Sequence, residues 1–256
     1  MRRGRIRSCQ RSDRGFTVIE LLIVIAVLVV LTAILLPCLR AARAVTKRAV
    51  CSSQLRQIGT AWFLYLHDSQ GLFYQDDTAH VKFGGWPGLM GYMPRPLNPY
   101  LGLEPEPNET EARILNCPAD RGGVPDPGLQ YERVYRLNGN SYCANIFLVG
   151  RNRVDDFTDD ADYWDAVRNR MAITTADEVG NPSRVLLAGD FGWYGQWNPL
   201  RDKPVELAEW HGRANSFNIV FVDGHVAFLE IEKGALASND CIVMPFKELW
   251  SWSSRP

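Results

Sequence analysis

Hydrophobic residues form one unbroken block near the start of the chain. From Phe16 to Leu36 the sequence is apolar except at Thr17, Glu20 and Thr32. An α-helix needs about 20 residues to cross the hydrocarbon core of a bilayer. The block therefore predicts a membrane-spanning helix. Glu20 lies inside it, and a carboxylate in hydrocarbon is costly and usually has a function.

The pattern changes after Pro37, where polar residues enter. Apolar residues then return at intervals of four, three, four and three positions, at Cys51, Leu55, Ile58, Trp62 and Tyr65. This spacing puts one apolar stripe on an amphipathic helix. We expect a single helix from about Phe16 to Leu66, whose second half packs under a globular domain. At about 1.5 Å per residue it would be roughly 75 Å long.

The remaining sequence favours short strands joined by turns. Asp223-Gly224 between two β-rich runs predicts a hairpin with a type I′ turn, which needs positive φ at both central residues. The fold class predicted is α+β, a pilin-like long N-terminal helix packed on an antiparallel sheet. The expected strands are 113–117, 141–148, 184–188, 217–222, 225–231 and 241–244.

Charge separates the first fifteen residues from the rest. Met1 to Gly15 holds six arginines and one aspartate. An ordinary secretory signal has its apolar stretch before the cleavage site, whereas here it follows the arginines. The arginine cluster predicts a cytoplasmic N-terminus, and hence an extracytoplasmic C-terminal part. Formal charge is −1 for the chain, which leaves about −6 without this leader and argues against nucleic-acid binding.

Six cysteines are present. Cys9 lies in the leader and Cys38 at the edge of the apolar block. An extracytoplasmic domain permits disulfides, and four cysteines allow three complete pairings that sequence does not distinguish. The four are Cys51, Cys117, Cys143 and Cys241.

The junction Gly15-Phe16-Thr17-Val18-Ile19-Glu20 resembles the cleavage and methylation site of type IV prepilins and type II secretion pseudopilins. The resemblance implies that a prepilin peptidase cuts after Gly15 and methylates Phe16, the new N-terminus. It also implies that Glu20 pairs with the terminal amine of a neighbouring subunit during assembly. The implied partners are the peptidase, an inner-membrane assembly platform and other pseudopilin subunits.

A second resemblance covers the C-terminal part. His211 followed by Asp223-Gly224 is similar to the His-Xn-Asp-Gly motif of a planctomycete-type group of pseudopilins, although eleven residues separate the two parts here and nine in the family motif. Three further segments match this group in order: 51–59, 117–120 and 182–185.

Four residues could form a metal site, namely Asp190, His211, Asp223 and His225. Two imidazoles and carboxylates suit zinc or another transition metal. The alternative is that Asp223 only makes the turn, His225 is a surface residue on the strand and His211 bonds to backbone. Separately, six aspartates between Asp155 and Asp165 suggest calcium or, alternatively, a solvated acidic loop leading into a helix.

An aromatic segment, Phe191 to Trp197, contains Trp193, Tyr194 and Trp197. Exposed aromatics would stack on sugars or anchor a partner; alternatively they cover the edge of the sheet. No motif for nucleophilic, metalloprotease or phosphate-binding chemistry occurs, so we expect no enzyme.

These observations divide the chain into a leader (1–15), a membrane part (16–36), an amphipathic part (37–67) and an extracytoplasmic domain (68–256) with the motif at 211–224. The main hypothesis is a pseudopilin-like structural subunit in the inner membrane, crossing it once, with a periplasmic domain. It would assemble into a type II secretion or type IV pilus-like filament. The alternative is a membrane-tethered protein that binds glycans or cargo, and a third is a metal-dependent enzyme on a pilin-like stalk.

Overall fold

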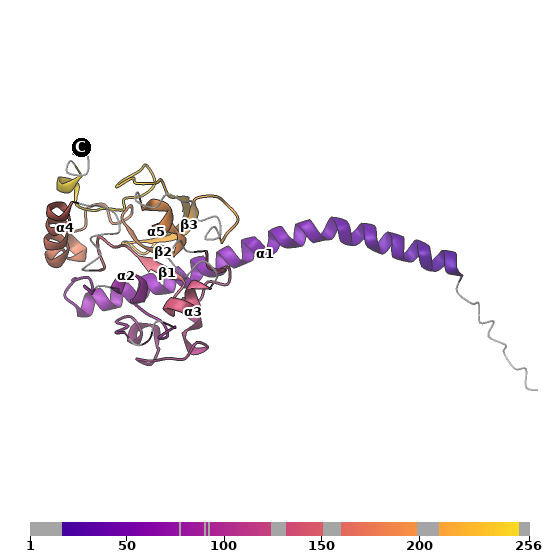
Figure 1. Cartoon of the computed structure of the whole chain (residues 1–256), viewed down its shortest axis with the longest axis horizontal. Coiled ribbons are helices and arrows are strands. Elements are labelled where there is room, and N and C mark those ends of the chain that lie inside the picture. The colour runs from indigo at the N-terminus through magenta and orange to yellow at the C-terminus, as the bar shows by residue number, and fades with distance from the viewer. Residues whose placement is uncertain are drawn as a thin grey trace, which may run out of the picture. The chain divides into compact units, whose positions relative to one another are not determined.

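The computed structural model (Figure 1) describes residues 17–76, 78–89, 91, 93–123, 132–150, 160–198 and 210–250. The chain divides into two compact units, residues 1–43 and 44–256. The second unit contains a four-stranded sheet, several short helices and the later part of the first helix.

Helix α1 runs from Val18 to Asp68, 51 residues with Pro37 inside it. Its bounds agree with the predicted long helix within two residues at each end. Because α1 continues through Pro37, the proline does not end the helix. The buried residues of α1 lie on the predicted stripe, except that Leu66 is buried and Tyr65 only partly buried. They are Cys51, Leu55, Ile58, Gly59, Ala61, Trp62 and Leu66.

The sheet has the order β1-β2-β3-β4, and every pair of neighbours is antiparallel. The α+β class, with a long apolar helix and an antiparallel sheet, is therefore confirmed. A bulge interrupts the β2–β3 pairing between Leu186 and Ala188. The strands are β1 (Tyr142–Ala144), β2 (Leu186–Asp190), β3 (Ser216–Phe221) and β4 (Val226–Glu230).

Helix α1 packs closely against the middle of this sheet. A Cβ on Gly59 would lie 2.9 Å from Val220 Cγ2, so the glycine lets helix and strand approach. Ser52 Oγ donates to Asn218 Oδ1 at 2.8 Å. Trp62, fully buried, lies edge-on to Tyr65 with ring centroids 5.6 Å apart. All six residues of β3 are buried, which explains its apolar character on both faces.

Short helices surround the sheet and long loops connect them. Helix α5 contacts both β1 and β3, and Figure 1 shows it beside the strands. The described part of the second unit contains the helices α2 (Ala79–Lys82), α3 (Val134–Asn138), α4 (Ala161–Ile173) and α5 (Gly192–Trp197), with 3-10 turns η1 (Pro99–Leu101), η2 (Glu111–Leu115), η4 (Ala176–Glu178) and η6 (Lys247–Leu249).

The hairpin between β3 and β4 forms where predicted, but its turn type was wrong. φ is positive at Gly224 (87°) and not at Asp223. Gly224 N–H donates to Phe221 O at 2.9 Å, and Phe221 N–H donates to His225 O at 3.0 Å. This is a longer loop with one left-handed glycine at its end, a common hairpin connection. Asp223 therefore does not need the left-handed conformation.

Two predicted strands were wrong and one was too long. Residues 113–117 belong mostly to the 3-10 turn η2, which ends at Leu115. The segment 241–244 forms only isolated bridges, in which Ile242 pairs with Val185 and with Ala237. The strand expected over 141–148 shortens to β1 because a turn begins at Asn145, whose Oδ1 accepts from the Phe147 N–H and whose backbone O accepts from the Leu148 N–H, both at 3.0 Å.

One disulfide joins α1 to the segment after η2. It links Cys51 to Cys117, whose Cα atoms are 5.3 Å apart, across 66 positions of sequence. Among the described cysteines outside the disulfide, Cys143 and Cys241 are buried and Cys38 is exposed. Burial raises the pKa of the Cys241 thiol, so it stays protonated near neutral pH. This pairing is one that the sequence had left open.

Candidate functional site

The first turn of α1 is closed by a reciprocal pair of side chains. Thr17 precedes the helix, and its N–H and Oγ1 donate to Glu20 Oε2 at 2.9 and 2.8 Å. Glu20 N–H donates back to Thr17 Oγ1 at 3.2 Å. Such a capping box satisfies backbone donors that a helix start leaves open. The predicted processing residues Gly15 and Phe16 lie outside the described residues.

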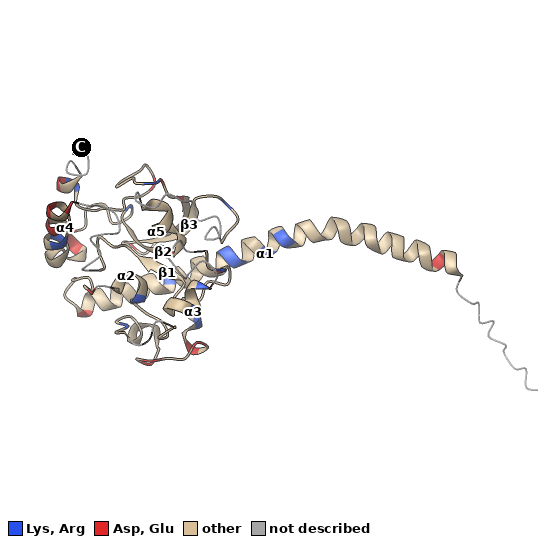
Figure 2. Ribbon diagram, viewed as in Figure 1, with Lys and Arg blue, Asp and Glu red and all other residues tan. Residues whose placement is uncertain are grey.

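The first part of α1 exposes apolar side chains on every side. Leu21, Leu22 and Ile23 follow one another and are each more than half exposed. The helix contains a segment apolar enough to cross a membrane, with mean hydropathy 3.2 and no residue buried. Figure 2 shows an uncharged stretch of α1 between one acidic position near its start and the first basic ones. A surface of this kind needs an apolar environment that the described part of the first unit does not supply.

A buried polar cluster lies where α1, β2 and the segment before β3 meet. His211 Nε2 lies 3.1 Å from Asp190 Oδ2, and both side chains are 1% exposed. The same nitrogen is 3.7 Å from Cys117 Sγ, in the disulfide to Cys51. One ligand-type atom from each of these four residues lies within 4.8 Å of the others. Asp190 and His211, predicted as partners, are therefore brought together.

One neighbouring residue fixes the carboxylate of Asp190. Asn218 donates to its Oδ2 from the backbone N–H at 2.7 Å and from Nδ2 at 2.9 Å. Asn218 stands in the middle of the buried strand β3, where a polar residue in an apolar run is the signal that sequence reasoning missed. Tyr142 pairs with Asp190 across β1 and β2, and burial, with the nearby carboxylates, raises the pKa of Tyr142 well above its usual value.

Asp120 is a second residue that sequence reasoning did not single out. Its carboxylate accepts hydrogen bonds from the N–H groups of Gly122, Val134 and Tyr135 and from Ser141 Oγ, at 2.7 to 3.2 Å. Four donors on one buried carboxylate hold the chain after Cys117 in place. The signal in the sequence was the motif Cys117-Pro118-Ala119-Asp120, in which the aspartate closes a turn three residues after the cysteine.

Asp223 and His225 form a separate pair at the hairpin. His225 Nδ1 lies 2.6 Å from Asp223 Oδ1, with side chains 46% and 34% exposed. The imidazole stacks on Phe221, with centroids 4.3 Å apart and planes 3° apart. Neither residue belongs to the ligand group around Asp190, so the four predicted metal ligands divide into two places. A single site with all four is wrong for this structure.

The aromatic segment is a helix, and its rings are buried. Trp193 and Trp197 are fully buried and Tyr194 is 3% exposed. Both indole N–H groups are satisfied, by Cys143 O and Ala235 O at 2.9 and 2.8 Å. The glycine-spaced aromatics therefore complete the core beside β1 and β3. The interpretation of them as an exposed glycan-binding surface was wrong.

The acidic stretch is described only in part, since 151–159 lie outside the described residues. Asp160 caps α4, its Oδ1 accepting from the Tyr163 N–H at 2.9 Å. Asp162 and Asp165 are exposed on α4. Tyr163, 2% exposed, has its pKa raised to about 12 by burial. The described aspartates thus start a helix and line its exposed face.

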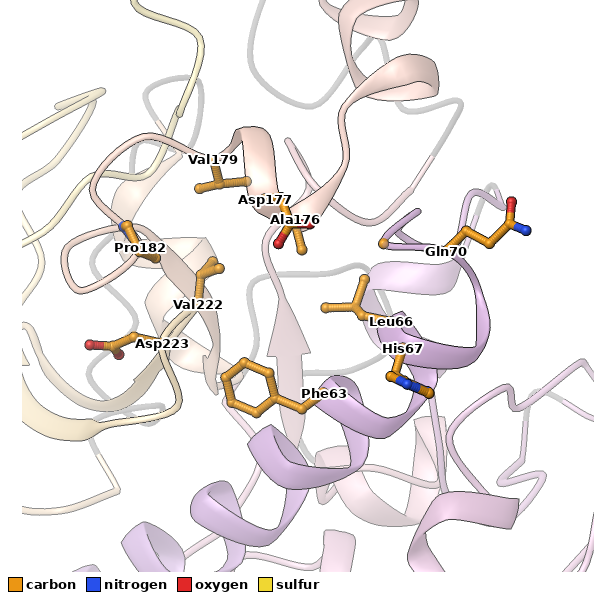
Figure 3. Close-up of a pocket in the computed structure, with 11 residues that line it drawn as sticks. Phe63, Leu66, His67, Gln70, Ala176, Asp177, Val179, Pro182, Val222 and Asp223 are labelled. Carbon is orange, nitrogen blue, oxygen red and sulfur yellow. The ribbon is translucent and has the colours of Figure 1, made fainter.

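A groove of about 660 Å³ lies beside the hairpin loop. Its walls come from the end of α1, from the loop after η4 and from the turn of the β3–β4 hairpin. Figure 3 shows Phe63, Leu66 and Val222 facing the space, whereas Asp223 and Gln70 point away from it. Most of the lining is apolar, and its acidic residues are Asp177 and Asp223.

Comparison with known proteins finds a family match for one segment of the chain. Residues 10–36 match the family model of the prokaryotic N-terminal methylation motif. The matched segment contains Gly15 and Phe16, continues through Glu20 and covers most of the exposed apolar part of α1. No curated protein and no solved structure matches the chain. The chain therefore carries a prepilin-type motif, which with the apolar helix indicates anchoring in a membrane.

Proposed function

We propose that this protein is a pseudopilin-like structural subunit without catalytic activity. Prepilin peptidase would cut it after Gly15, and mature subunits would assemble by packing their α1 helices. The product would be a type II secretion or type IV pilus-like filament rooted in the inner membrane. On this proposal the N-terminus faces the cytoplasm and the second unit decorates the filament on the periplasmic side.

One observation carries this proposal: the methylation motif covers residues 10–36 and continues into a helix whose apolar residues are exposed on all sides. Val18 to Leu36 includes large side chains that are each 46% to 75% exposed. In a free monomer such a coat is tolerated only in lipid. In a filament the same coat packs against neighbouring helices, so one segment serves both states.

Glu20 is the only ionisable residue between Val18 and Leu36. In the monomer its carboxylate accepts from Thr17, so its charge is shared with local donors. Cleavage after Gly15 would create an amine four residues before it. On assembly, a positive amine of the next subunit would replace these weaker donors, because a charged pair in hydrocarbon is much favoured over a lone carboxylate.

The partners follow from this chemistry. Prepilin peptidase would process the leader, an inner-membrane platform would extract the helix from the bilayer, and other pseudopilins would supply the neighbouring helices. The basic residues after the apolar segment, Arg40, Arg43, Lys47 and Arg48, would remain at the polar boundary.

The test is the intact mass and N-terminal peptide of the protein from native membranes. A chain that begins at Phe16 with one added methyl group supports the proposal. A chain that keeps Met1 to Gly15, in cells with active peptidase, contradicts it.

Glu20→Gln separates processing from assembly. We expect this variant to be cleaved and methylated normally and to lose most of its cross-linking to neighbouring subunits in membranes. Glu178→Gln, far from the apolar segment in sequence, is the matched control and should cross-link like the unmodified protein. Normal cross-linking of Glu20→Gln would remove the role given to this carboxylate.

A further inference from the structure

The cluster of Cys51, Cys117, Asp190 and His211 offers more than a disulfide. We infer that the dithiol form of this protein binds one zinc ion at these four residues, so that zinc and the disulfide are alternative closures of one centre. Two thiolates, an imidazole and a carboxylate are ligands that zinc accepts, and thiolate with imidazole favours zinc over the hard cations.

The distances in the cluster fit a tetrahedral ion. Zinc binds nitrogen and oxygen at about 2.0–2.2 Å and sulfur at about 2.3 Å, so neighbouring ligands lie about 3.3 Å (N to O) and about 3.6 Å (N to S) apart. Nε2 of His211 is 3.1 Å from Asp190 Oδ2 and 3.7 Å from Cys117 Sγ. These two edges exist before any ion enters.

Unsatisfied polar atoms lie at the same place. Within the described part of the chain, Asp190 Oδ1 and His211 Nδ1 are buried and have no hydrogen-bond partner. A buried carboxylate oxygen without a donor is costly, and a cation bound to this carboxylate would offset that cost. Nδ1 of His211 can carry the ring proton while Nε2 binds the ion.

Each ligand stands on an element that is fixed independently. Cys51 belongs to α1, Asp190 ends β2, and Asp120 holds the backbone after Cys117. Trp210 Nε1–H donates to Gly122 O at 3.0 Å and holds the segment of His211 against the same loop. The histidine ring meets Phe228 edge-on at 6.1 Å. The ligand residues are thus held in place before metal binds.

Zinc binding exchanges protons, and disulfide formation exchanges electrons and protons. A newly made chain carries two thiols, and zinc displaces one proton from each when it binds. Starting from the disulfide, a thiol or phosphine reductant supplies two electrons and the sulfurs take up two protons before zinc enters. Conversely, an oxidant that removes two electrons forms the disulfide and releases the ion. The two closures therefore exclude each other.

The experiment uses the full-length protein in detergent micelles. Oxidised and phosphine-reduced samples are incubated with zinc chloride, desalted and measured for metal content. We expect about one zinc per reduced chain and none per oxidised chain, with an X-ray absorption spectrum of two sulfur and two nitrogen or oxygen neighbours. No retained zinc in the reduced sample, equal zinc in both samples, or zinc without sulfur neighbours would overturn the inference.

Variants locate the site. Asp190→Asn keeps an oxygen for the two Asn218 donors but gives up the charge, and we expect zinc affinity to fall at least tenfold, of the order seen when shells around a metal are disturbed. His225→Ala is the matched control, since His225 pairs with Asp223 elsewhere, and should bind zinc normally. Loss of zinc in His225→Ala with retention in Asp190→Asn would place the ion at the hairpin and refute this site.

Discussion

The two halves of α1 are built from similar apolar residues and differ in how these are arranged. In the first half, consecutive residues such as Leu21, Leu22 and Ile23 are all exposed. In the second half, Leu55 and Ile58 are fully buried, while Arg56 and Gln57 between them are exposed. An apolar stripe on one face of a helix can be buried within the same chain, whereas apolar residues on all sides of a helix require an apolar partner outside the chain.

The first prediction concerns a substitution in the buried second half of α1. Trp62→Ala removes a fully buried ring packed among Tyr65, Phe73 and Phe83. We expect a loss of about 3–5 kcal/mol in the free energy of unfolding, measured by near-ultraviolet circular dichroism of the full chain in micelles. Leu28→Ala, whose side chain is 54% exposed, is the control and should leave the transition unchanged. An equal loss in both variants would contradict the division of α1.

The second prediction concerns the covalent link to the buried half. Replacing Cys51 and Cys117 together by serine frees a loop closed over 66 positions. The chain-entropy model gives a loss of about 4 kcal/mol, visible as a lower midpoint in urea under oxidising conditions. Cys143→Ser, at a buried cysteine outside the disulfide, is the control and keeps the cross-link. The same midpoint in the double variant and in the unmodified protein would show that the link adds no stability.

The third and smallest prediction concerns the start of the exposed half. Thr17→Ala removes one side of the capping box, and we expect a loss of about 1 kcal/mol confined to the first turn of α1. Hydrogen exchange in micelles would show faster exchange there and unchanged rates in the sheet. Thr32→Ala is the control, because Thr32 Oγ1 donates to carbonyls at 2.9 Å within the helix and caps nothing. Unchanged exchange in Thr17→Ala would leave the cap without a role.

The sequence predicted those parts of the fold in which periodicity alone decides. The four-three spacing from Cys51 onward specified the buried face of α1, and the Asp-Gly pair located the hairpin. The prediction was wrong where short-range hydrogen bonds compete with pattern. Residues 113–117 have strand-like composition, yet Asn108 Oδ1 accepts from the N–H groups at 110 and 111 and starts a 3-10 turn.

The candidate site was only half predictable. Asp190 and His211 were identified as partners by residue type, but their other neighbours come from positions far away in sequence. The disulfide partner of Cys51 depends on how α1 lies against the loop after η2, which no local pattern encodes. The aromatic segment showed the opposite weakness, because composition does not reveal whether rings such as Trp193 face solvent or the core.

The disulfide also has a mechanical consequence. In the proposed filament, force would enter each subunit through α1, since that helix makes the contacts between subunits. Apolar contacts between helix and sheet yield slowly under a steady pull, because side chains can slip past one another. The bond from Cys51 to Cys117 lies near the start of the second unit, so it would take up tension before the contacts around Trp62 do. A subunit with this bond closed would pass a pull on its helix to the rest of the second unit without stretching.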